Sequence, residues 1–424
     1  MTLAEPAGAR WSLRWLDPDG RKLLVTRLLR TFGYGYLAVV LAIYLQKVGL
    51  SSEQVGALLT AAVAGSTVMT VFWSLAADRL GRRRTVATMS LLMIVGGLLF
   101  AASDNFWVLL LGAFTGTISA SSAEVGPFQT VEQAVLPGTA PDERRTWLFS
   151  IYDMLGNFAG AAGAVFAGTV GLWSAVGLDG ADAYRPLFLL YAAIGLVNLV
   201  VFLSLSPKVE LAQLNAKRNF VGLHRSTGTV VKLSALFSLD SFAGGFVLQS
   251  IVAYWFHLKW NLSPEALGVV FFWVGVLSGL SLLAAGWMAD RFGLLNTMVF
   301  THLPSNVLLI LVPLMPSAWL AVALFLARMT VSQMDVPTRK SYLMAVVDPD
   351  ERTPAAGITN VARTGASALS PALAGLAFAG GALSLPFLLA GGLKIVYDGL
   401  VWRTFHDVRP PEEVARLEAR SAAA

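Results

Sequence analysis

Ionisable side chains occur inside stretches of this chain that are otherwise long and apolar. A charge in the middle of a bilayer costs at least ~2.5–3.5 kcal/mol, so a retained one needs a partner or a function. The candidates for binding a proton or a substrate are the acids Glu124, Asp153, Asp240 and Asp335 and the bases Arg27, Arg30 and Arg328. A buried carboxylate with a raised pKa can carry a proton near neutral pH. The alternative is that these groups only neutralise one another, for example Arg27 and Arg30 with Asp153 or Glu124.

Two of the acids lie beside expected breaks in a helix. Glu124 precedes Gly126 and Pro127, and proline removes a backbone donor, which is tolerated where a helix lines a cavity. Asp240 comes shortly before a pair of glycines at 244–245. Glu124 is therefore our first choice for a proton- or substrate-binding carboxylate, and Asp240 is its expected counterpart in the second half of the chain.

A third acid, Asp335, repeats the arrangement of an acid followed by a proline, here Pro337. Arg328 lies two helical turns before Asp335, so the two share a helix face but are ~10 Å apart along the axis. We expect them to bind separate partners. Arg339 and Lys340 are expected to be anchors at the cytoplasmic end of the same segment.

Other kinds of chemistry are excluded or unsupported. The chain has no cysteine, which excludes disulfides, thiol catalysis and cysteine metal sites. Its four histidines are scattered and form no metal-ligand motif. We find neither a nucleophile with a base nor a phosphate-binding loop, so we expect no enzyme, no catalytic residues, no cofactor and no metal.

The composition indicates the elements that carry these residues. Charged residues make up 13% of the chain and hydrophobic ones 56%, with a mean hydropathy of +0.65. A soluble domain carries about a quarter charged residues. Runs of about 20 apolar residues recur, each long enough to cross a bilayer as a helix. We therefore predict an all-α polytopic membrane protein. Its twelve spans are expected near 23–47, 53–77, 85–103, 106–136, 145–171, 185–205, 231–257, 265–289, 297–315, 317–346, 353–380 and 384–404.

The loops predict the orientation and the domains. Lys and Arg concentrate in the loops that face the cytoplasm if both termini are inside. We therefore attribute the net charge of +5 to basic residues in the cytoplasmic loops that set the orientation, and we expect no nucleic-acid partner. Asp17 and Pro18 fit an N-cap and a first helical position. The predicted divisions are a cytoplasmic segment 1–22, a six-helix bundle 23–206, a cytoplasmic linker 207–230, a second bundle 231–404 and a tail 405–424.

The two predicted bundles are related by a repeat. The sequence AADRLGRRRT at 76–85 is nearly copied by MADRFGLLNT at 288–297, and Asp78 and Asp290 are 212 positions apart, half of the 424-residue length. With this offset, residues 49–85 match residues 261–297 at ten of 37 positions, without a gap. A six-helix unit used twice is a design found in transporters.

The repeated turn carries a resemblance to a known family. Ser74 through Arg83 resembles the loop 2–3 signature of the major facilitator superfamily, GxxxDRxGRR, and Gly286 through Gly293 resembles the second copy. The resemblance covers nearly the whole chain and implies twelve helices in two pseudo-symmetric bundles. The sequence departs from it where Ser74 replaces a glycine and where leucines at 294–295 replace two arginines.

The turns are expected to form cytoplasmic latches between the halves. A glycine permits the tight turn, and an acid at a helix end can meet the N-terminus of a helix in the other half. An arginine of the first turn, Arg79 or Arg82, is expected to pair with Glu132. The expected latch residues are Asp78, Arg79, Gly81, Arg82, Glu132, Asp290, Arg291 and Gly293. Alternatively, the arginines only anchor the loops by their positive charge.

These observations favour a secondary transporter that works by alternating access. The first hypothesis is proton-coupled export of a small organic or amphipathic molecule from a bacterial cytoplasmic membrane, by a monomer in the lipid bilayer. The span-five glycines lack the proline that drug antiporters of the family often carry, which counts against drug antiport. The alternatives are an importer or uniporter of a nutrient or anionic solute, with Arg27, Arg30 and Arg328 matching its charge, or a receptor or scaffold without transport.

Overall fold

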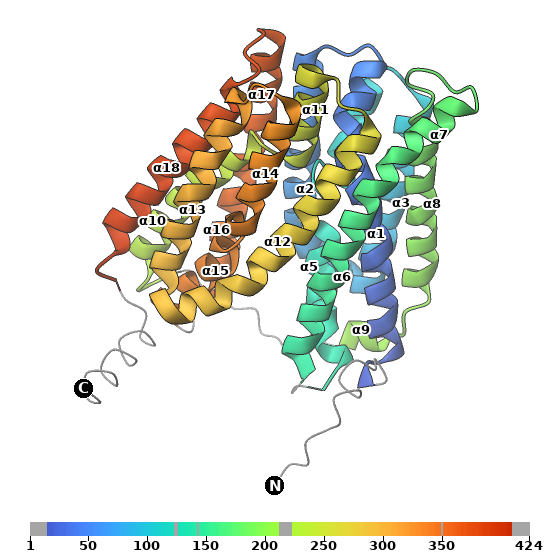
Figure 1. The fold of residues 1–424 in the computed structure, drawn as a ribbon. Coiled ribbons are helices and arrows are strands. Elements are labelled where there is room, and N and C mark those ends of the chain that lie inside the picture. Colours follow the sequence, from blue (N-terminus) through green and yellow to red (C-terminus); the bar gives the residue numbers. More distant parts are fainter. Residues whose placement is uncertain (1–14, 123–125, 142–143, 212–222, 349–350, 409–424) are drawn as a thin grey trace.

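The computed structural model describes residues 15–122, 126–141, 144–211, 223–348 and 351–408, and its helices form two bundles (Figure 1). The first bundle contains α1 (Pro18–Lys47), α2 (Ser52–Leu80), α3 (Arg82–Ala102), α4 (Phe106–Phe114), α5 (Pro127–Val135), α6 (Arg145–Phe166), α7 (Val170–Ala175) and α8 (Arg185–Leu203). The short helix α9 (Lys208–Leu211) follows it. The second bundle contains α10 (Thr227–Gly245), α11 (Gln249–Trp260), α12 (Pro264–Phe292), α13 (Leu294–Leu311), α14 (Ala318–Ser332), α15 (Asp335–Val346), α16 (Arg352–Ser367), α17 (Ser370–Ala379) and α18 (Leu385–Phe405).

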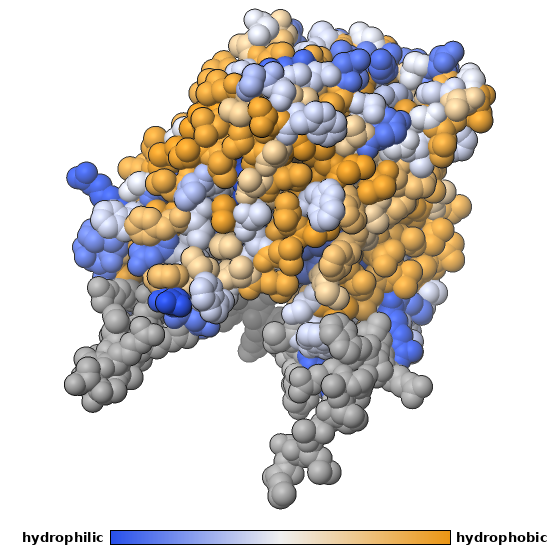
Figure 2. Space-filling view, viewed as in Figure 1, coloured by the Kyte–Doolittle hydropathy of each residue, from blue (hydrophilic) through white to orange (hydrophobic). Residues whose placement is uncertain are grey.

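The surface is that of an integral membrane protein. Ten segments of the described chain are long and apolar enough to cross a bilayer, and the pairs α4–α5 and α16–α17 supply the remaining two of the twelve predicted passes. Large apolar side chains are exposed on the outside of the bundles, among them Leu111, Leu172, Leu283 and Trp319. Figure 2 shows apolar residues as a broad band across the face, with hydrophilic residues toward both ends.

The internal repeat produces matching helices. Both α2 and α12 have 29 residues, and each begins after a serine, Ser51 or Ser263, whose side chain accepts a backbone hydrogen bond. Each ends at a glycine with positive φ, 90° at Gly81 and 88° at Gly293. Side chains with a Cβ rarely adopt this conformation, so glycine allows the immediate turn into the next helix.

Several passes are interrupted where the sequence contains glycine or proline. The fourth pass loses its helix between α4 and α5, and α5 begins at Pro127, which confirms the break expected beside Gly126. The seventh pass breaks after Gly245, and the tenth divides into α14 and α15 just before Asp335. Because proline lacks an N–H and glycine weakens a helix, these positions are natural ends.

The helix starts differ slightly from the predicted spans. Asp17 is the N-cap of α1, its side chain accepts from the Asp19 backbone, and Pro18 is the first helical residue, as predicted. The helix therefore begins five positions before the expected span start at 23. The seventh pass likewise begins at Thr227 and not at 231, and the linker residue Ser226 occupies its N-cap position without a side-chain cap hydrogen bond.

The two bundles touch closely at the end opposite the chain termini, and in Figure 1 they diverge toward the termini. Hydrogen bonds between them join Ser52 to Tyr254 (2.9 Å) and Ala372 to Thr60 (2.9 Å). The hydroxyl of Ser250 also donates to the carbonyl of Ala38 at 3.0 Å. With the predicted orientation, this closed end faces away from the cytoplasm.

Glycines allow this close approach. A Cβ on Gly56 of α2 would lie 2.7 Å from the carbonyl oxygen of Pro371 and 2.8 Å from Cα of Gly375 in α17. The repeat partner of Gly56 is Gly268 of α12, where a Cβ would lie 2.5 Å from the carbonyl oxygen of Ala164 in α6. The same repeated glycine therefore forms both contacts, α2 with α17 and α12 with α6.

Candidate functional site

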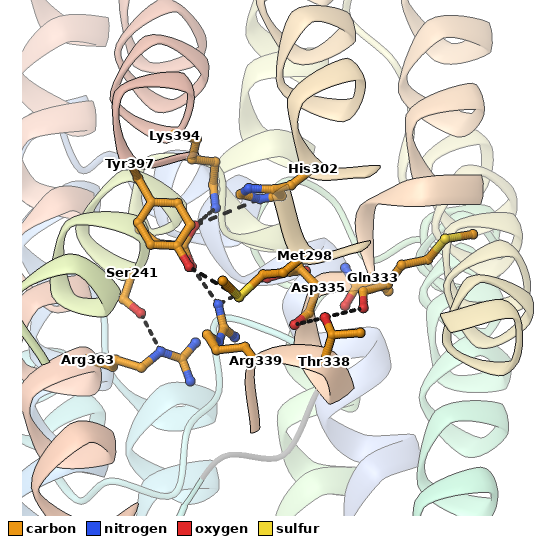
Figure 3. Close-up of polar contacts among 12 residues, drawn as sticks. Ser241, Met298, His302, Gln333, Asp335, Thr338, Arg339, Arg363, Lys394 and Tyr397 are labelled. Carbon is orange, nitrogen blue, oxygen red and sulfur yellow. Dashed lines mark hydrogen bonds and ion pairs between the residues drawn. The ribbon is translucent and has the colours of Figure 1, made fainter. Parts of the chain in front are cut away.

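Buried ionisable residues of the second bundle converge on Asp240 of α10. Figure 3 shows His302, Arg339 and Lys394 of this group. One oxygen of Asp240 accepts from Nζ of Lys394 in α18 at 2.5 Å. The other accepts from Nη1 of Arg339 in α15 at 2.9 Å, and the same Nη1 donates to Asp335 at 3.0 Å. All four residues are buried, with Asp240 only 4% exposed. In a medium of low dielectric constant, such pairing is what allows the charges to persist.

The network extends to α13 through a histidine. Nδ1 of His302 lies 2.8 Å from Oδ1 of Asp398 in α18, and the amide of Asn306 donates to Oδ2 of Asp398 at 3.0 Å. On its other side, Nε2 of His302 faces Oδ1 of Asp240 at 3.9 Å. The helices α10, α13, α15 and α18 thus meet in one charged cluster.

Sequence reasoning only partly identified this cluster. It selected Asp240 and Asp335 correctly as buried acids, but it read Arg339 as a cytoplasmic anchor, which is wrong because Arg339 is 4% exposed and bridges both acids. His302 was considered only as a possible metal ligand and was left out of the candidates for proton or substrate binding. Lys394 and Asp398 were recognised as ionisable groups inside the last span, but their spacing of four residues, which places them on one helix face, was not used.

Two arginines lie beside this cluster without a carboxylate bonded to them in the described structure. Arg328 of α14 is 8% exposed, its Nη1 contacts the sulfur of Met329 at 3.9 Å, and its Nε makes no hydrogen bond. Nε of Arg363 in α16 donates to the hydroxyl of Ser241 at 3.0 Å. Arg328 and Asp335 thus have separate partners, as expected. The charges of Asp240 and Asp335 act on both arginines.

The first bundle contains a smaller buried ion pair. Nη2 of Arg30 in α1 lies 2.7 Å from Oε2 of Glu132 in α5, and both side chains are fully buried. The hydroxyls of Tyr152 and Thr26 donate to the same carboxylate at 2.6 and 3.1 Å. We expected Glu132 to pair with Arg79 or Arg82, and this was wrong, because its oxygens are occupied inside the bundle. Arg30 is therefore paired with Glu132 in the described structure.

Arg27 and Asp153 lie nearby but in different surroundings. Arg27 is buried, its guanidinium stacks over the Tyr152 ring at 4.4 Å, and a Cβ on Gly156 would lie 2.8 Å from its Nε. Asp153 is exposed on α6, and the charges that act on it come from Arg27 and from Lys340 of α15 in the other bundle. Glu124, our first choice from the sequence, lies outside the described residues.

The first of the repeated turns is positioned by the linker rather than by Glu132. The carboxylate of Glu210 in α9 accepts from the backbone N–H groups of Arg82 and Arg83 at 2.8 and 3.0 Å, and so caps the N-terminus of α3. The side chain of Arg82 donates to the carbonyl of Ala134 at 3.3 Å, and Arg79 is exposed. The side chain of Asp78 lies outside what the structure describes. Sequence reasoning missed Glu210.

In the second turn, Asp290 and Arg291 are exposed, and the Arg291 guanidinium lies 5.7 Å from the centre of the Trp287 ring. A second linker contact lies below this bundle. Glu351 accepts from the backbone N–H groups of Arg225 and Ser226, both at 2.8 Å, and from that of His224. Burial acts to raise the pKa of Glu351, but these hydrogen bonds outweigh it and lower the pKa to about 2. Each end of the linker is therefore held by one carboxylate.

Comparison with known proteins identifies the family. The model of the major facilitator superfamily matches residues 23–258 and 234–423, which together cover most of the chain. The chain belongs to the major facilitator superfamily. It is thus a secondary transporter and not an enzyme, consistent with the twelve-pass fold and with the repeated turn.

Two individual proteins are similar to this chain, one over most of its length and one over a short part. The Saccharomyces cerevisiae membrane protein YJR124C is 27% identical over 413 residues, covering 90% of this chain and 92% of the relative. The quinolone resistance protein NorA of Staphylococcus aureus is 31% identical, but over only 94 residues, 22% of this chain and 24% of NorA.

Solved structures of similar fold cover nearly the whole chain. The nucleoside transporter NupG gives a TM-score of 0.73 at 13% identity, covering 92% of this chain and 99% of NupG. A D-xylose–proton symporter gives 0.69 at 17% identity, covering 90% and 97%. A bacterial homologue of the lysosomal transporter Spinster, in an inward-facing conformation, gives 0.72 at 16%, covering 92% and 97%. At these identities the likeness supports the fold alone.

Proposed function

We propose that this transporter exports a small organic or amphipathic molecule in exchange for protons. The observation that carries the proposal is the buried cluster around Asp240, where three carboxylates, two basic residues and a histidine meet inside one bundle. Ionisable groups at this depth are costly and typically mark proton or substrate pathways. The short match to NorA, which is named for quinolone resistance, supports export.

The proposed cycle moves the two bundles about a central site. In the present conformation the bundles are joined at the end opposite the termini, by contacts such as Gly56 with Gly375. With the predicted orientation the bundles then diverge toward the cytoplasm, where an exporter collects its substrate. The reverse state would close the cytoplasmic end through the repeated turns that contain Asp78 and Asp290. Glu124 and Asp240 remain the proposed proton-binding residues of the two bundles.

Transport assays with purified protein in proteoliposomes test this proposal. We would record the internal pH as a panel of organic cations, neutral amphipaths and organic anions is added, with Asp240→Asn and Glu124→Gln beside the wild type. Substrate-dependent proton movement that is lost in either variant supports the proposal. If the substrate flux is equal in all three proteins and no proton signal accompanies it, proton coupling is refuted. The protein would then be a uniporter or would use another coupling ion. Exchange of the exposed Asp407 to Asn is a control that leaves both bundles intact.

A second candidate is the import of an anionic solute. Arg328 and Arg363 favour it, because neither is bonded to a carboxylate in the described structure although both lie beside the cluster. Their charges suit a carboxylate or phosphate group of a substrate. Competition between substrates of opposite charge separates the candidates, since only this one predicts that Arg328→Gln selectively weakens the transport of anions.

The proposed setting is the cytoplasmic membrane of a bacterium. Both termini would be cytoplasmic, and a single chain would suffice for transport because each bundle contributes to one central site. Labelling of engineered cysteines from either side of the membrane tests the orientation, and this is simplified because the natural chain has no cysteine.

A further inference from the structure

His302 is held between two carboxylates with only one of them in contact. Nδ1 lies at hydrogen-bond distance from Asp398, while Nε2 faces Asp240 at 3.9 Å, which is too long for a hydrogen bond. His302 is 2% exposed and Asp398 is completely buried. When Nδ1–H donates to Asp398, the lone pair of Nε2 points to a second carboxylate. This nitrogen is a natural position for one additional proton.

The same oxygen of Asp240 is already bonded to a lysine. Nζ of Lys394 lies 2.5 Å from Oδ1, the atom that Nε2 of His302 faces. The two distances to this shared oxygen place the nitrogens no more than about 6.4 Å apart. Two positive charges so close in a buried site repel each other. Lys394 and a protonated His302 therefore compete for Asp240.

With His302 neutral, the charges of the hydrogen-bonded cluster do not balance, and one additional proton would neutralise them. Three carboxylates, those of Asp240, Asp335 and Asp398, are joined to two basic residues, Arg339 and Lys394, and to His302. With His302 neutral, this set carries one net negative charge. Protonation of His302 brings it to zero, which a buried environment favours.

Other elements packed against His302 contribute few further charges. Arg328 of α14 and Arg363 of α16 lie outside the bonded set and add positive charge, which opposes protonation. Tyr397 of α18 lies edge-on to the imidazole at 6.0 Å. The charged residues of α12 are confined to its first and last turns. Among the described residues, the charged groups nearest to His302 are Asp398 and Asp240, and Lys394 bonds to the second of them.

Lys394 is placed to connect this site with the substrate. It is the most exposed residue of the bonded cluster, at 7%, and a Cβ on the half-buried Gly244 would lie 3.8 Å from its Nζ. His302 and Asp398 lie deeper in the bundle. A substrate group that draws Lys394 away from Asp240 would thus free Oδ1 for the histidine.

We propose that His302, oriented by Asp398, is a proton-binding site whose occupancy is linked to Lys394 through Asp240. The proton is taken from water and adds to Nε2, Nδ1–H remains with Asp398, and Nε2–H then donates to Oδ1 of Asp240. Departure of Lys394 promotes this step, and its return expels the proton. The inference rests on the proposed proton coupling and moves the proton of this bundle from Asp240 itself to the neighbouring His302, with Asp240 as the ionised acceptor.

Histidine-selective nuclear magnetic resonance tests this site in the full-length protein. The chain has only four histidines, so ¹³C,¹⁵N-histidine labelling gives few signals, and the one lost in His302→Gln identifies His302. We expect a neutral form protonated at Nδ1 and a protonated form at lower pH. In Lys394→Met the midpoint should rise by roughly two pH units, about a 100-fold gain in proton affinity, for an effective dielectric constant of ~20.

Lys259→Met is the control variant for Lys394→Met. Lys259→Met should leave the midpoint unchanged, because Lys259 bonds to the carbonyl of Pro313 and not to Asp240. The inference is overturned if His302 keeps one protonation state between pH 5 and 9 in both the wild type and Lys394→Met. It is also overturned if the midpoint of the His302 titration is the same in the two proteins. In proteoliposomes, proton movement that persists in His302→Gln refutes this inference alone, whereas its absence in the wild type refutes the proposed function.

Discussion

Adding one methyl group at Gly56 should open the closed end of the transporter. The new Cβ of Gly56→Ala would lie 2.7 Å from the Pro371 carbonyl oxygen and 2.8 Å from Cα of Gly375. Both are backbone atoms, so no side-chain rotation relieves the clash, and α17 must move away from α2. Overpacking of this kind costs about 1–3 kcal/mol.

This cost applies only to the conformation in which α2 and α17 touch. A state with the bundles separated at this end avoids it, so the equilibrium should shift by about 5- to 150-fold toward that state. Gly268→Ala should act in the same direction at the α12–α6 contact, because its new Cβ would lie 2.5 Å from the carbonyl oxygen of Ala164. Gly279→Ala is the matched control, because nothing lies within 4 Å of its new Cβ.

Distances between paired spin labels measure the shift. Labels would be attached to cysteines introduced at two exposed positions, Lys47, the last residue of α1, and Ala382, before α18. The chain has no natural cysteine to compete with them. We expect a larger population at longer distance in Gly56→Ala than in Gly279→Ala. The reasoning is refuted if the two variants give the same distance distribution as the unsubstituted protein.

The remaining predictions concern ion pairs elsewhere in the chain. Glu132→Gln takes the carboxylate partner from the buried Arg30, so it should lower stability by about 3–5 kcal/mol, seen as a lower unfolding temperature, and Arg30→Met in the same chain should recover part of it. Reversing the charge of Asp153 should disfavour closure of the cytoplasmic end by up to about 1 kcal/mol, and reversing Lys340 as well should restore it; equal spin-label distances across that end in all forms would contradict this. Because the folded-state pKa of Glu351 lies below its ordinary value of 4.5, its hold on the linker is complete above that value and is lost as the pH falls toward about 2. In the unsubstituted protein, the hydrogen-exchange rates of the amides of residues 224–226 should thus rise to those of Glu351→Gln only as the pH falls from 4.5 toward about 2. Equal rates in the two proteins at pH 7 would disprove the contact.

Much of the architecture could be predicted from local sequence features. The apolar runs define the passes, and the offset of 212 positions predicts that α2 and α12 are copies, which both have 29 residues and end at Gly81 and Gly293. The break before Pro127 and the break after Gly245 were also predictable. Such features depend on residues close in sequence, because helix ends are set by capping groups, glycine and proline.

The pairing of the buried charges could not be predicted in the same way. The sequence shows that acids and bases are present in the spans, but each acid has several bases at suitable depth. Glu132 bonds to Arg30 across 102 positions of the chain and Asp240 to Lys394 across 154. These choices depend on which helix faces meet, and small errors in helix rotation exchange one partner for another.

The sequence alone therefore determined that this chain is a twelve-pass membrane protein made of two related bundles, with ionisable groups inside them. Hydrophobicity, glycine and proline act locally or through the repeat, so their consequences can be read along the chain. Only the tertiary structure decided that Arg339 bridges two acids, that His302 stands between Asp398 and Asp240, and that Glu210 and Glu351 hold the linker. The reason is that a buried charge is stabilised by whichever opposite charge packing places within hydrogen-bond distance, and packing is a property of the assembled helices.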